Sequence, residues 1–459
     1  MKELILIAGL GVLALPAGLL NLKKLFMPIV LIGLATMVGF CIMDWNSNEE
    51  VFGMLLMDNF ALAFTGMFST VAILWFILAG DYFTDDTNFS DHYALVLFIL
   101  TGGLLLVSFT HVVMLFLGIE ILSIPLFVLV GSNKGRLVSN EAAFKYFLLG
   151  SFASAFMLFG IALIYGSTGS FYTADIAAFL NSHQDNVPAI LFAGMLLIMM
   201  SLAFKVSAAP FHYWAPDVYQ GAPTNITAFM ATIVKMVAFG GFYRMFHTAF
   251  ETIQESYVIV IYCICILSLI IANVTAAVQS NVKRMLAYSS VSHAGFMMIA
   301  LLTMHSNTAN ILFYYIAVYS LSSIAAFAVL KHVKANTRGD SSIGAFSGLV
   351  KRNPLIAGTM TLAMLSMAGI PPLAGFMAKY FIFTAAVANG YIWLVVIAII
   401  ASLIGVFYYF KVIISMFGKS QMEPTPIEIS FTQKLLLMIC SIGMLVLSVV
   451  PDLLLNLLK

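Results

Sequence analysis

The segment PAILFAGMLLIMMSLAFKVSAAPFHYWAPDVYQGAPT, residues 188–224, begins as a membrane helix and cannot continue as one. Its first part is apolar up to Lys205, and Pro210, Pro216 and Pro223 then follow within fourteen residues. A proline removes a backbone donor and clashes with the preceding turn of a helix. In lipid, such a break is tolerated only where it is buried in protein or lines a cavity. The segment therefore predicts a broken transmembrane helix with a lysine at the break.

The composition places the whole chain in a membrane. Of its 459 residues, 62% are hydrophobic and 9% are charged, whereas soluble proteins have about 25% charged residues. The net charge of +1 and the lack of a basic run give no indication of nucleic-acid binding. The cysteines lie in or beside apolar stretches, so we expect them to pack in the core rather than to bind a metal. They are Cys41, Cys263, Cys265 and Cys440.

Stretches of about 20 apolar residues, the length that crosses a bilayer, predict an all-α integral membrane protein with fourteen transmembrane helices. The first stretch is longer than the apolar part of a signal peptide, so we expect it to be retained as a helix. The twelfth contains Pro371-Pro372 and is too long for one straight crossing, so it is predicted to be broken, like the seventh. The expected spans are 2–20, 26–43, 58–80, 93–110, 111–131, 142–166, 188–213, 223–247, 257–279, 282–303, 307–332, 354–389, 391–417 and 432–457.

The basic residues predict the orientation of the chain, because cytoplasmic loops are enriched in lysine and arginine. The side of the membrane that holds the loops after odd-numbered spans carries most of them, and the opposite side holds Lys2, Arg244 and Lys459. Both termini are therefore predicted to face away from the cytoplasm. The basic residues on the cytoplasmic side are Lys23, Lys24, Lys134, Arg136, Lys283, Arg284, Lys331, Lys334, Arg338, Lys351, Arg352, Lys411, Lys419 and Lys434.

The remaining lysines lie inside predicted spans, and so does Glu120. An ionisable residue within a membrane indicates an ion or proton pathway by default. Lys235 and Glu120 lie near the middle of their spans, where the alternative is a buried ion pair with a structural role. Lys145 lies nearer a helix end, where its ammonium group could instead reach the membrane surface. The four lysines inside spans are Lys145, Lys205, Lys235 and Lys379.

Lys379 also lies beside a proline break, in GIPPLAGFMAKYF (369–381), so the pattern at Lys205 occurs twice. Carbonyls freed by a break can stabilise an ammonium group, although proline kinks alone can reflect packing. Glu120 is expected about 4–8 Å from Lys205, because an opposite charge at such a distance controls whether a buried group is protonated.

The two broken spans cross the membrane in opposite directions, which predicts two inverted five-helix repeats. We expect N-terminal helices in 1–92, one repeat in 93–247, the second in 257–417 and a last helix in 432–459. In this arrangement His293 corresponds to Glu120. Histidine is suited to proton relay because its pKa lies near neutrality, although a single membrane histidine can also be a packing residue.

Three segments resemble the antiporter-like membrane subunits of respiratory complex I: FKVSAAPFHYWAPDVYQGAPT (204–224), NVKRMLAYSSVSHAGF (281–296) and GIPPLAGFMAKYF. The resemblance implies a proton-translocating subunit that is driven by quinone reduction elsewhere in the complex. It also implies roles for individual residues in proton transfer. Glu120, Lys205, Lys235 and Lys379 match the charged axis of the family, and Lys145 and His293 match further polar positions.

The same resemblance implies a subunit of NADH-quinone oxidoreductase, a translocase, with no cofactor, metal or redox centre in this chain. Flavin, iron–sulfur clusters and quinone are then expected in partner subunits. The expected neighbours are the antiporter-like subunit M, small membrane subunits such as K, and the lipid of a bacterial inner membrane, with both termini periplasmic. The alternatives are a subunit of a multi-subunit cation/proton antiporter and a membrane scaffold. Flavin and iron–sulfur subunits would co-purify only with a complex I subunit.

Overall fold

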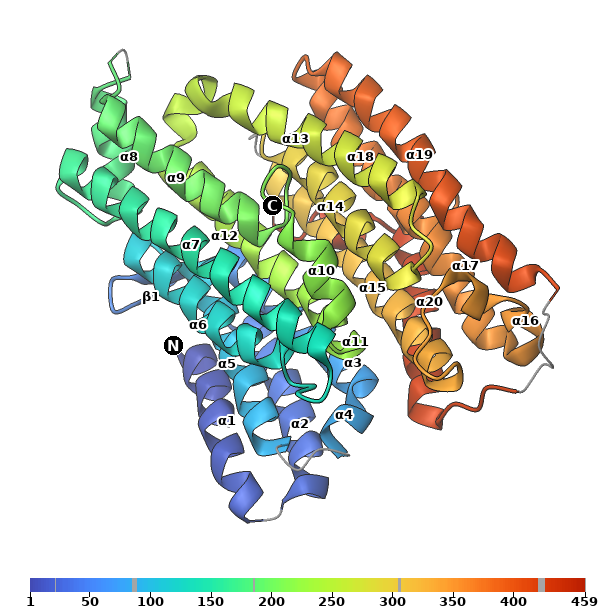
Figure 1. Cartoon of the computed structure of the whole chain (residues 1–459). Coiled ribbons are helices and arrows are strands. Elements are labelled where there is room, and N and C mark those ends of the chain that lie inside the picture. Colours follow the sequence, from blue (N-terminus) through green and yellow to red (C-terminus); the bar gives the residue numbers. More distant parts are fainter. Residues whose placement is uncertain (21, 85–88, 185, 304–306, 420–425, 459) are drawn as a thin grey trace. The chain divides into compact units, whose positions relative to one another are not determined.

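The computed structural model describes residues 1–459 except 21, 85–88, 185, 304–306, 420–425 and 459 (Figure 1). Ten helices of the described chain are long and apolar enough to cross a membrane. Three shorter apolar helices, Ala189–Lys205, Pro354–Ala368 and Ala374–Ala388, belong to the two spans that were predicted to be broken. The described chain is thus mostly helical and suited to a bilayer, as the sequence predicted.

The chain forms two compact units that exchange short segments of sequence. The first unit comprises Met1–Val206 and Ile233–Val260, together with Leu458. The second unit comprises Ser207–Thr232 and Ile261–Leu457. The chain therefore passes from one unit to the other after Val206, the neighbour of Lys205, and returns at Ile233, two residues before Lys235.

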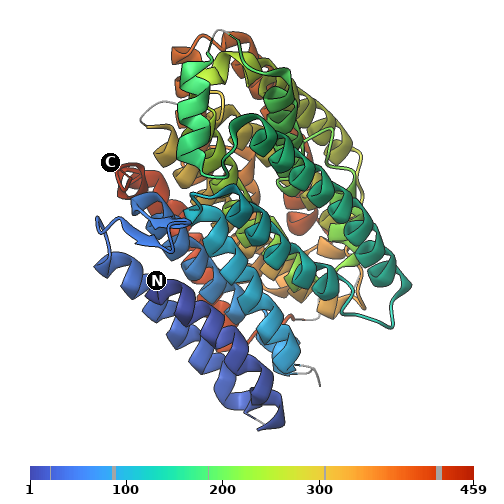
Figure 2. The ribbon, with the colours of Figure 1, turned by 90° about the vertical axis from the view of Figure 1, so that its left-hand side faces the viewer.

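The first unit is a bundle in which α7 and α9 lie side by side (Figure 2). A side chain added at Gly160 of α7 would place its Cβ 2.6 Å from the carbonyl oxygen of Gly194 in α9, so glycine is required for this close approach. The elements are α1 (Lys2–Leu19), α2 (Lys23–Met43), β1 (Glu49–Val51), β2 (Leu55–Met57), α3 (Asn59–Leu78), α4 (Gly80–Thr84), α5 (Phe89–Ser108), α6 (Val112–Val130), α7 (Leu137–Thr168), α8 (Thr173–Ser182), α9 (Ala189–Lys205) and α12 (Lys235–Ala249).

A short antiparallel hairpin, β1–β2, departs from the predicted all-α fold. Arg244 of α12 binds the chain beside this hairpin. Its guanidinium group is 4% exposed and donates to the carbonyl oxygens of Val107 and Phe109, each at 2.9 Å, just where α5 ends. It also pairs at 3.0 Å with Asp58, whose carboxylate caps the N-terminus of α3. Arg244 was predicted on the periplasmic side, and here it joins α12, α5 and α3.

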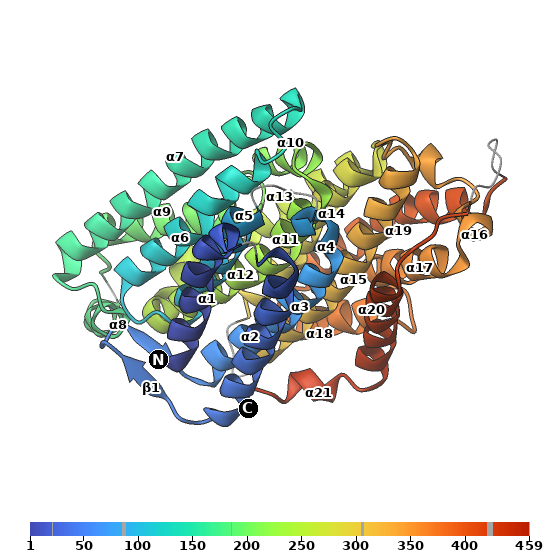
Figure 3. The ribbon, with the colours of Figure 1, turned by 90° about the horizontal axis from the view of Figure 1, so that it is seen from below.

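In the second unit α15 packs against α17, α18 and α20 (Figure 3). A turn of π-helix, Met230–Val234, lies where the chain returns to the first unit, and α13 (Gln254–Ala277) begins in the first unit and ends in the second. The other elements are α10 (Trp214–Gly221), α11 (Thr224–Phe229), α14 (Val282–Ala300), α15 (Thr308–Asn336), α16 (Leu349–Arg352), α17 (Pro354–Ala368), α18 (Ala374–Ala388), α19 (Ile392–Phe417), α20 (Phe431–Val449) and α21 (Asp452–Leu455), with a 3-10 turn at Ile343–Phe346. A further 3-10 turn, Glu251–Ile253, belongs to the first unit.

Two basic residues in the first turn of α14 hold α10 in place. Lys283 is 1% exposed and donates to the carbonyl oxygens of Ala222 and Gln220 at the C-terminus of α10. Arg284 pairs with Asp217 at 2.8 Å and donates to the side-chain oxygen of Gln220 at the same distance. Cations are favoured at a helix C-terminus, where the carbonyls lack partners. Asp217 thus has a structural partner in the helix that follows the first break.

Candidate functional site

The first predicted break lies where the prolines placed it. Helix α9 ends at Lys205, and α10 begins only at Trp214. Between them Ser207 has a φ of 61°, in the left-handed region that a helix cannot use. Lys205 is therefore the last residue of a membrane helix and lies next to non-helical backbone.

The ammonium group of Lys205 is buried, with the side chain 4% exposed. It donates to Ser123 Oγ of α6 at 2.6 Å and lies 5.9 Å from the ring centre of Phe127. Ser123 in turn donates to the carbonyl oxygen of Ile119. The charge thus has one neutral oxygen and aromatic rings as its described partners.

No hydrogen bond or ion pair joins Glu120 to Lys205 among the described residues, and the Lys205 ammonium group is bonded to Ser123 instead. Glu120 is half-buried, and its Oε1 atom has no hydrogen-bond partner among those residues. Ser123 follows Glu120 by three residues on α6, so both lie on the same face of that helix. The predicted interaction between Glu120 and Lys205 stays a prediction. The sequence missed Ser123, whose spacing from Glu120 was the available signal.

The second break has a similar lysine with a different partner. Helix α17 ends at Ala368 and α18 begins at Ala374. Lys379 is 6% exposed and donates to the carbonyl oxygen of Ala368 at 2.8 Å. It also donates to Ser402 Oγ at 2.7 Å and lies 4.8 Å from the ring centre of Phe296. A carbonyl freed by the break therefore binds the ammonium group, as the sequence predicted.

Gly369 makes this contact sterically feasible. Its φ of 82° lies in the left-handed region, which L side chains rarely adopt. A Cβ at this position would lie 2.8 Å from Lys379 Cδ and 3.1 Å from its Nζ. The glycine therefore ends α17 and leaves room for the lysine.

Lys235 follows the π-helical turn Met230–Val234 directly and is 2% exposed. Such turns often occur at functional sites, because the widened helix displaces one residue from the regular ladder of hydrogen bonds. Nothing in the sequence of this turn indicated it. The predicted central lysine is thus buried and lies at a local irregularity of its helix.

His293 of α14 contacts two tyrosines that the sequence analysis did not single out. Its Nδ1 atom lies 2.8 Å from Tyr315 Oη of α15, and its Nε2 atom lies 3.3 Å from Tyr409 Oη of α19. The imidazole is 5% exposed. Each ring nitrogen therefore faces a hydroxyl group that can donate or accept.

Lys145 differs from the other predicted residues because it is at the surface of the described chain. Its side chain is 41% exposed and forms an ion pair at 2.7 Å with Glu141, one turn earlier in α7. Such a pair between exposed groups contributes little to stability. The burial of the other lysines is thus not shared by Lys145.

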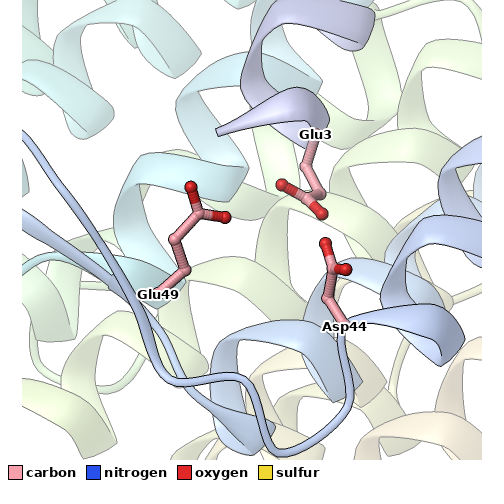
Figure 4. Close-up of side chains that lie close together, drawn as sticks. All are labelled: Glu3, Asp44 and Glu49. Atoms are coloured by element: carbon pink, nitrogen blue, oxygen red, sulfur yellow. The ribbon is translucent and has the colours of Figure 1, made fainter.

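An acidic cluster at the start of the chain has ammonium groups as its partners. Carboxylate oxygens of Glu3, Asp44 and Glu49 lie within 4.8 Å of one another, and Figure 4 shows the side chains converging. The amino group of Met1 bonds Glu3 and Glu49, each at 3.1 Å, and Lys2 pairs with Asp44 at 2.7 Å. The cluster therefore connects α1 to the end of α2 and to β1.

Residues 110–405 match the family described as NADH:quinone oxidoreductase/Mrp antiporter, transmembrane. The NADH-quinone oxidoreductase subunit N of Cytophaga hutchinsonii is 44% identical over 461 aligned residues, covering 99% of each chain. The chain belongs to the subunit N family of NADH-quinone oxidoreductases. The segment PDVYQGAPT (216–224) and the length of the chain had indicated the same subunit.

Solved structures show the same fold. A chain of respiratory complex I from Thermus thermophilus is 31% identical with a TM-score of 0.84, covering 99% of this chain and 98% of that one. A chain of the Mrp complex from Dietzia sp. is 20% identical with a TM-score of 0.87, covering 100% and 96%. The Mrp likeness reflects the shared fold alone, so family membership favours complex I over the alternative antiporter. The chain is thus an antiporter-like, proton-translocating membrane subunit, as predicted.

Proposed function

We propose that Glu120, Lys205, Lys235, His293 and Lys379 carry protons through this subunit, driven by quinone reduction elsewhere in NADH-quinone oxidoreductase. The observation that carries the proposal is the surroundings of two buried lysines at helix breaks. Lys205 and Lys379 bind neutral oxygens, of Ser123 and of Ala368 and Ser402, rather than a carboxylate. A buried lysine whose charge is only partly compensated by its surroundings can gain and lose its proton.

Glu120 is the group that would control Lys205. An approaching carboxylate stabilises the protonated lysine, and a withdrawing one favours release of the proton. Ser123 keeps the ammonium group in place while Glu120 moves or changes its protonation, because the hydroxyl group remains bonded to Lys205 in either state. Proton loading could thus be switched without disrupting the fold.

The architecture that supports this role has fourteen transmembrane helices, with two inverted five-helix repeats at 93–247 and 257–417. The flanking parts, 1–92 and 432–459, would complete the membrane domain, with both termini on the periplasmic side of the inner membrane. Lys145, exposed on α7 and paired with Glu141, would join the path only from the surface of the subunit. Inverted repeats place the sites for transported ions near the middle of the bilayer.

The proposed partners are the other subunits of the enzyme, including subunit M and small membrane subunits such as K. Flavin, iron–sulfur clusters and quinone would be held by those subunits, because the sequence offers no redox motif. The proposed function therefore requires that this chain be purified with subunits that contain flavin and iron–sulfur clusters.

The test is the replacement of Lys235 by alanine in the intact enzyme, with assembly followed by native gel electrophoresis. We expect the complex to assemble and either to lose turnover or to lose proton pumping, because the buried central group of the proposed path is then missing. Lys134→Ala, at an exposed lysine between α6 and α7, is the control and should retain at least half of the pumping. Normal pumping by an assembled Lys235→Ala enzyme would refute the role of this lysine.

A further inference from the structure

Hydrogen bonds extend from His293 along α14 in a chain of hydroxyl groups. Tyr409 Oη of α19 lies 3.3 Å from His293 Nε2 and also bonds Ser289 Oγ. Ser289 precedes His293 by one turn, about 6 Å along the helix axis. The chain of bonds thus leads from the imidazole toward the N-terminal end of α14, which carries Lys283 and Arg284.

On its other side His293 faces a cavity at the second break. The cavity is lined by Tyr315, Ser322, Ser366 and Ala378 as well as by His293, and it has room for about one water molecule. Ser366 belongs to the last turn of α17, and Ala378 is the neighbour of Lys379 in α18. Tyr315, whose Oη lies 2.8 Å from His293 Nδ1, lines the same cavity.

We propose that Tyr315, Tyr409 and Ser289 form a hydroxyl relay that leads from the cavity at the second break through His293 and along α14 toward its N-terminal end. This inference rests on the proposed function, since it adds a branch to the proposed path. The relay would serve as part of a route for protons between the path and the side predicted to be cytoplasmic.

The chemistry of the relay is balanced at each step. His293 accepts a proton at Nδ1, which faces Tyr315, and releases one from Nε2, which faces Tyr409. Tyr409 accepts that proton at Oη while its own hydroxyl proton passes to Ser289 Oγ, and Ser289 releases its own hydroxyl proton toward the N-terminal end of α14. Tyr315, which gives its hydroxyl proton to His293 Nδ1, would regain one from water in the cavity that it lines. Each step forms one N–H or O–H bond and breaks another, and no oxidant or reductant takes part. Imidazole is suited to this exchange because its two nitrogens can have opposite roles.

The burial of these hydroxyl groups makes a purely aqueous route at this position difficult. Tyr315 is 2% exposed, Tyr409 is 1% exposed and Ser289 is 1% exposed. A hydroxyl group can donate and accept at once, so a buried row of them passes protons where bulk water has no access. Phenylalanine at either tyrosine position keeps the ring and interrupts the row.

The experiment compares Tyr409→Phe and Tyr315→Phe with Tyr314→Phe in membranes that contain the assembled enzyme. Tyr314 is the neighbour of Tyr315 on α15 and is equally buried, but its hydroxyl donates to the carbonyl oxygen of Leu447. We expect each of the first two variants to pump protons at least about tenfold more slowly. The loss of a positioned proton-transfer group typically slows a reaction by about 100-fold or more, so tenfold is the smallest effect that the relay predicts. Tyr314→Phe should stay within about twofold of the unaltered enzyme, since losing this one hydrogen bond affects stability only modestly.

The solvent deuterium isotope effect on turnover separates a relay from a merely structural hydrogen bond. It should increase in Tyr409→Phe, because proton transfer then limits the rate, and it should stay unchanged in Tyr314→Phe. Ser289→Ala is a smaller change at the next hydroxyl group and should also slow pumping. It replaces Tyr409→Phe as the test if that variant does not assemble. Pumping by Tyr409→Phe, Tyr315→Phe and Ser289→Ala at the level of Tyr314→Phe would overturn the relay.

Lys379→Ala distinguishes a failure of the relay from a failure of the proposed function. If Lys379→Ala abolishes pumping while the three hydroxyl variants pump normally, the path stands and the relay is wrong. If Lys379→Ala itself pumps normally in an assembled enzyme, the proposed function fails, and the relay fails with it.

Discussion

Replacing Gly369 by alanine should displace Lys379 from the end of α17. The added Cβ would lie 2.8 Å from Lys379 Cδ, closer than real Cβ contacts allow, so the lysine must move. Its hydrogen bond to the carbonyl oxygen of Ala368, now 2.8 Å long, would then be weakened or lost. The variant therefore tests whether the geometry of the break holds the lysine in place.

The expected loss of stability in Gly369→Ala has two parts, one from the backbone and one from the hydrogen bond of Lys379. A left-handed φ, 82° at this residue, costs an alanine about 1–2 kcal/mol. Losing a hydrogen bond to a charged group costs about 1.5–3 kcal/mol. Gly390 provides a matched control, because its φ is 83° and an added Cβ would have nothing within 4 Å. Gly390→Ala should therefore lose only the stability that the left-handed φ costs an alanine.

The assay is the thermal stability of the purified enzyme together with its proton pumping. Gly369→Ala should be less stable than Gly390→Ala, and it alone should pump more slowly. In the double variant Gly369→Ala/Lys379→Ala the steric conflict is absent. The double variant should therefore be less stable than Lys379→Ala by the same amount that Gly390→Ala is less stable than the unaltered enzyme. Equal stability and equal pumping of Gly369→Ala and Gly390→Ala would refute the reasoning.

Three further predictions concern the first unit. Glu120→Gln should slow pumping more than Glu120→Asp, since glutamine keeps the volume but loses the charge that acts on Lys205; equal rates for both would mean that shape, not charge, matters. Ser123→Ala should slow pumping about tenfold or more, because the Lys205 ammonium loses a charged hydrogen bond of about 1.5–3 kcal/mol, whereas Ser123→Thr keeps the hydroxyl group and should retain most activity; identical pumping rates in both variants would argue against this contact. Arg244→Met should destabilise the enzyme by about 2–4 kcal/mol in thermal or chemical unfolding, because buried carbonyls lose their donor, with Arg244→Lys intermediate; unchanged stability would show that the guanidinium group does not hold α5.

The sequence by itself determined which two membrane helices are broken and which residues carry charge beside the breaks. A proline acts on the turn that precedes it, so the ends of α9 and α17 follow from the residues beside them. A lysine near the middle of an apolar span, or beside a helix break, indicates a functional or structural role whichever helix lies next to it. Lys205, Lys235 and Lys379 could therefore be selected without knowing their partners.

Only the tertiary structure decided what each of these groups binds. Ser123 lies 82 residues before Lys205, and Tyr409 lies 116 residues after His293. Such partners depend on how helices pack and rotate, and a serine or tyrosine in a membrane helix carries no signal of which neighbour it faces. The surface position of Lys145 was likewise undecided, because the spacing of one helix shows its faces but not what covers them. Neighbouring residues along the chain determined the breaks and the charges. Packing between distant segments determined which oxygens accept hydrogen bonds from the lysine ammonium groups.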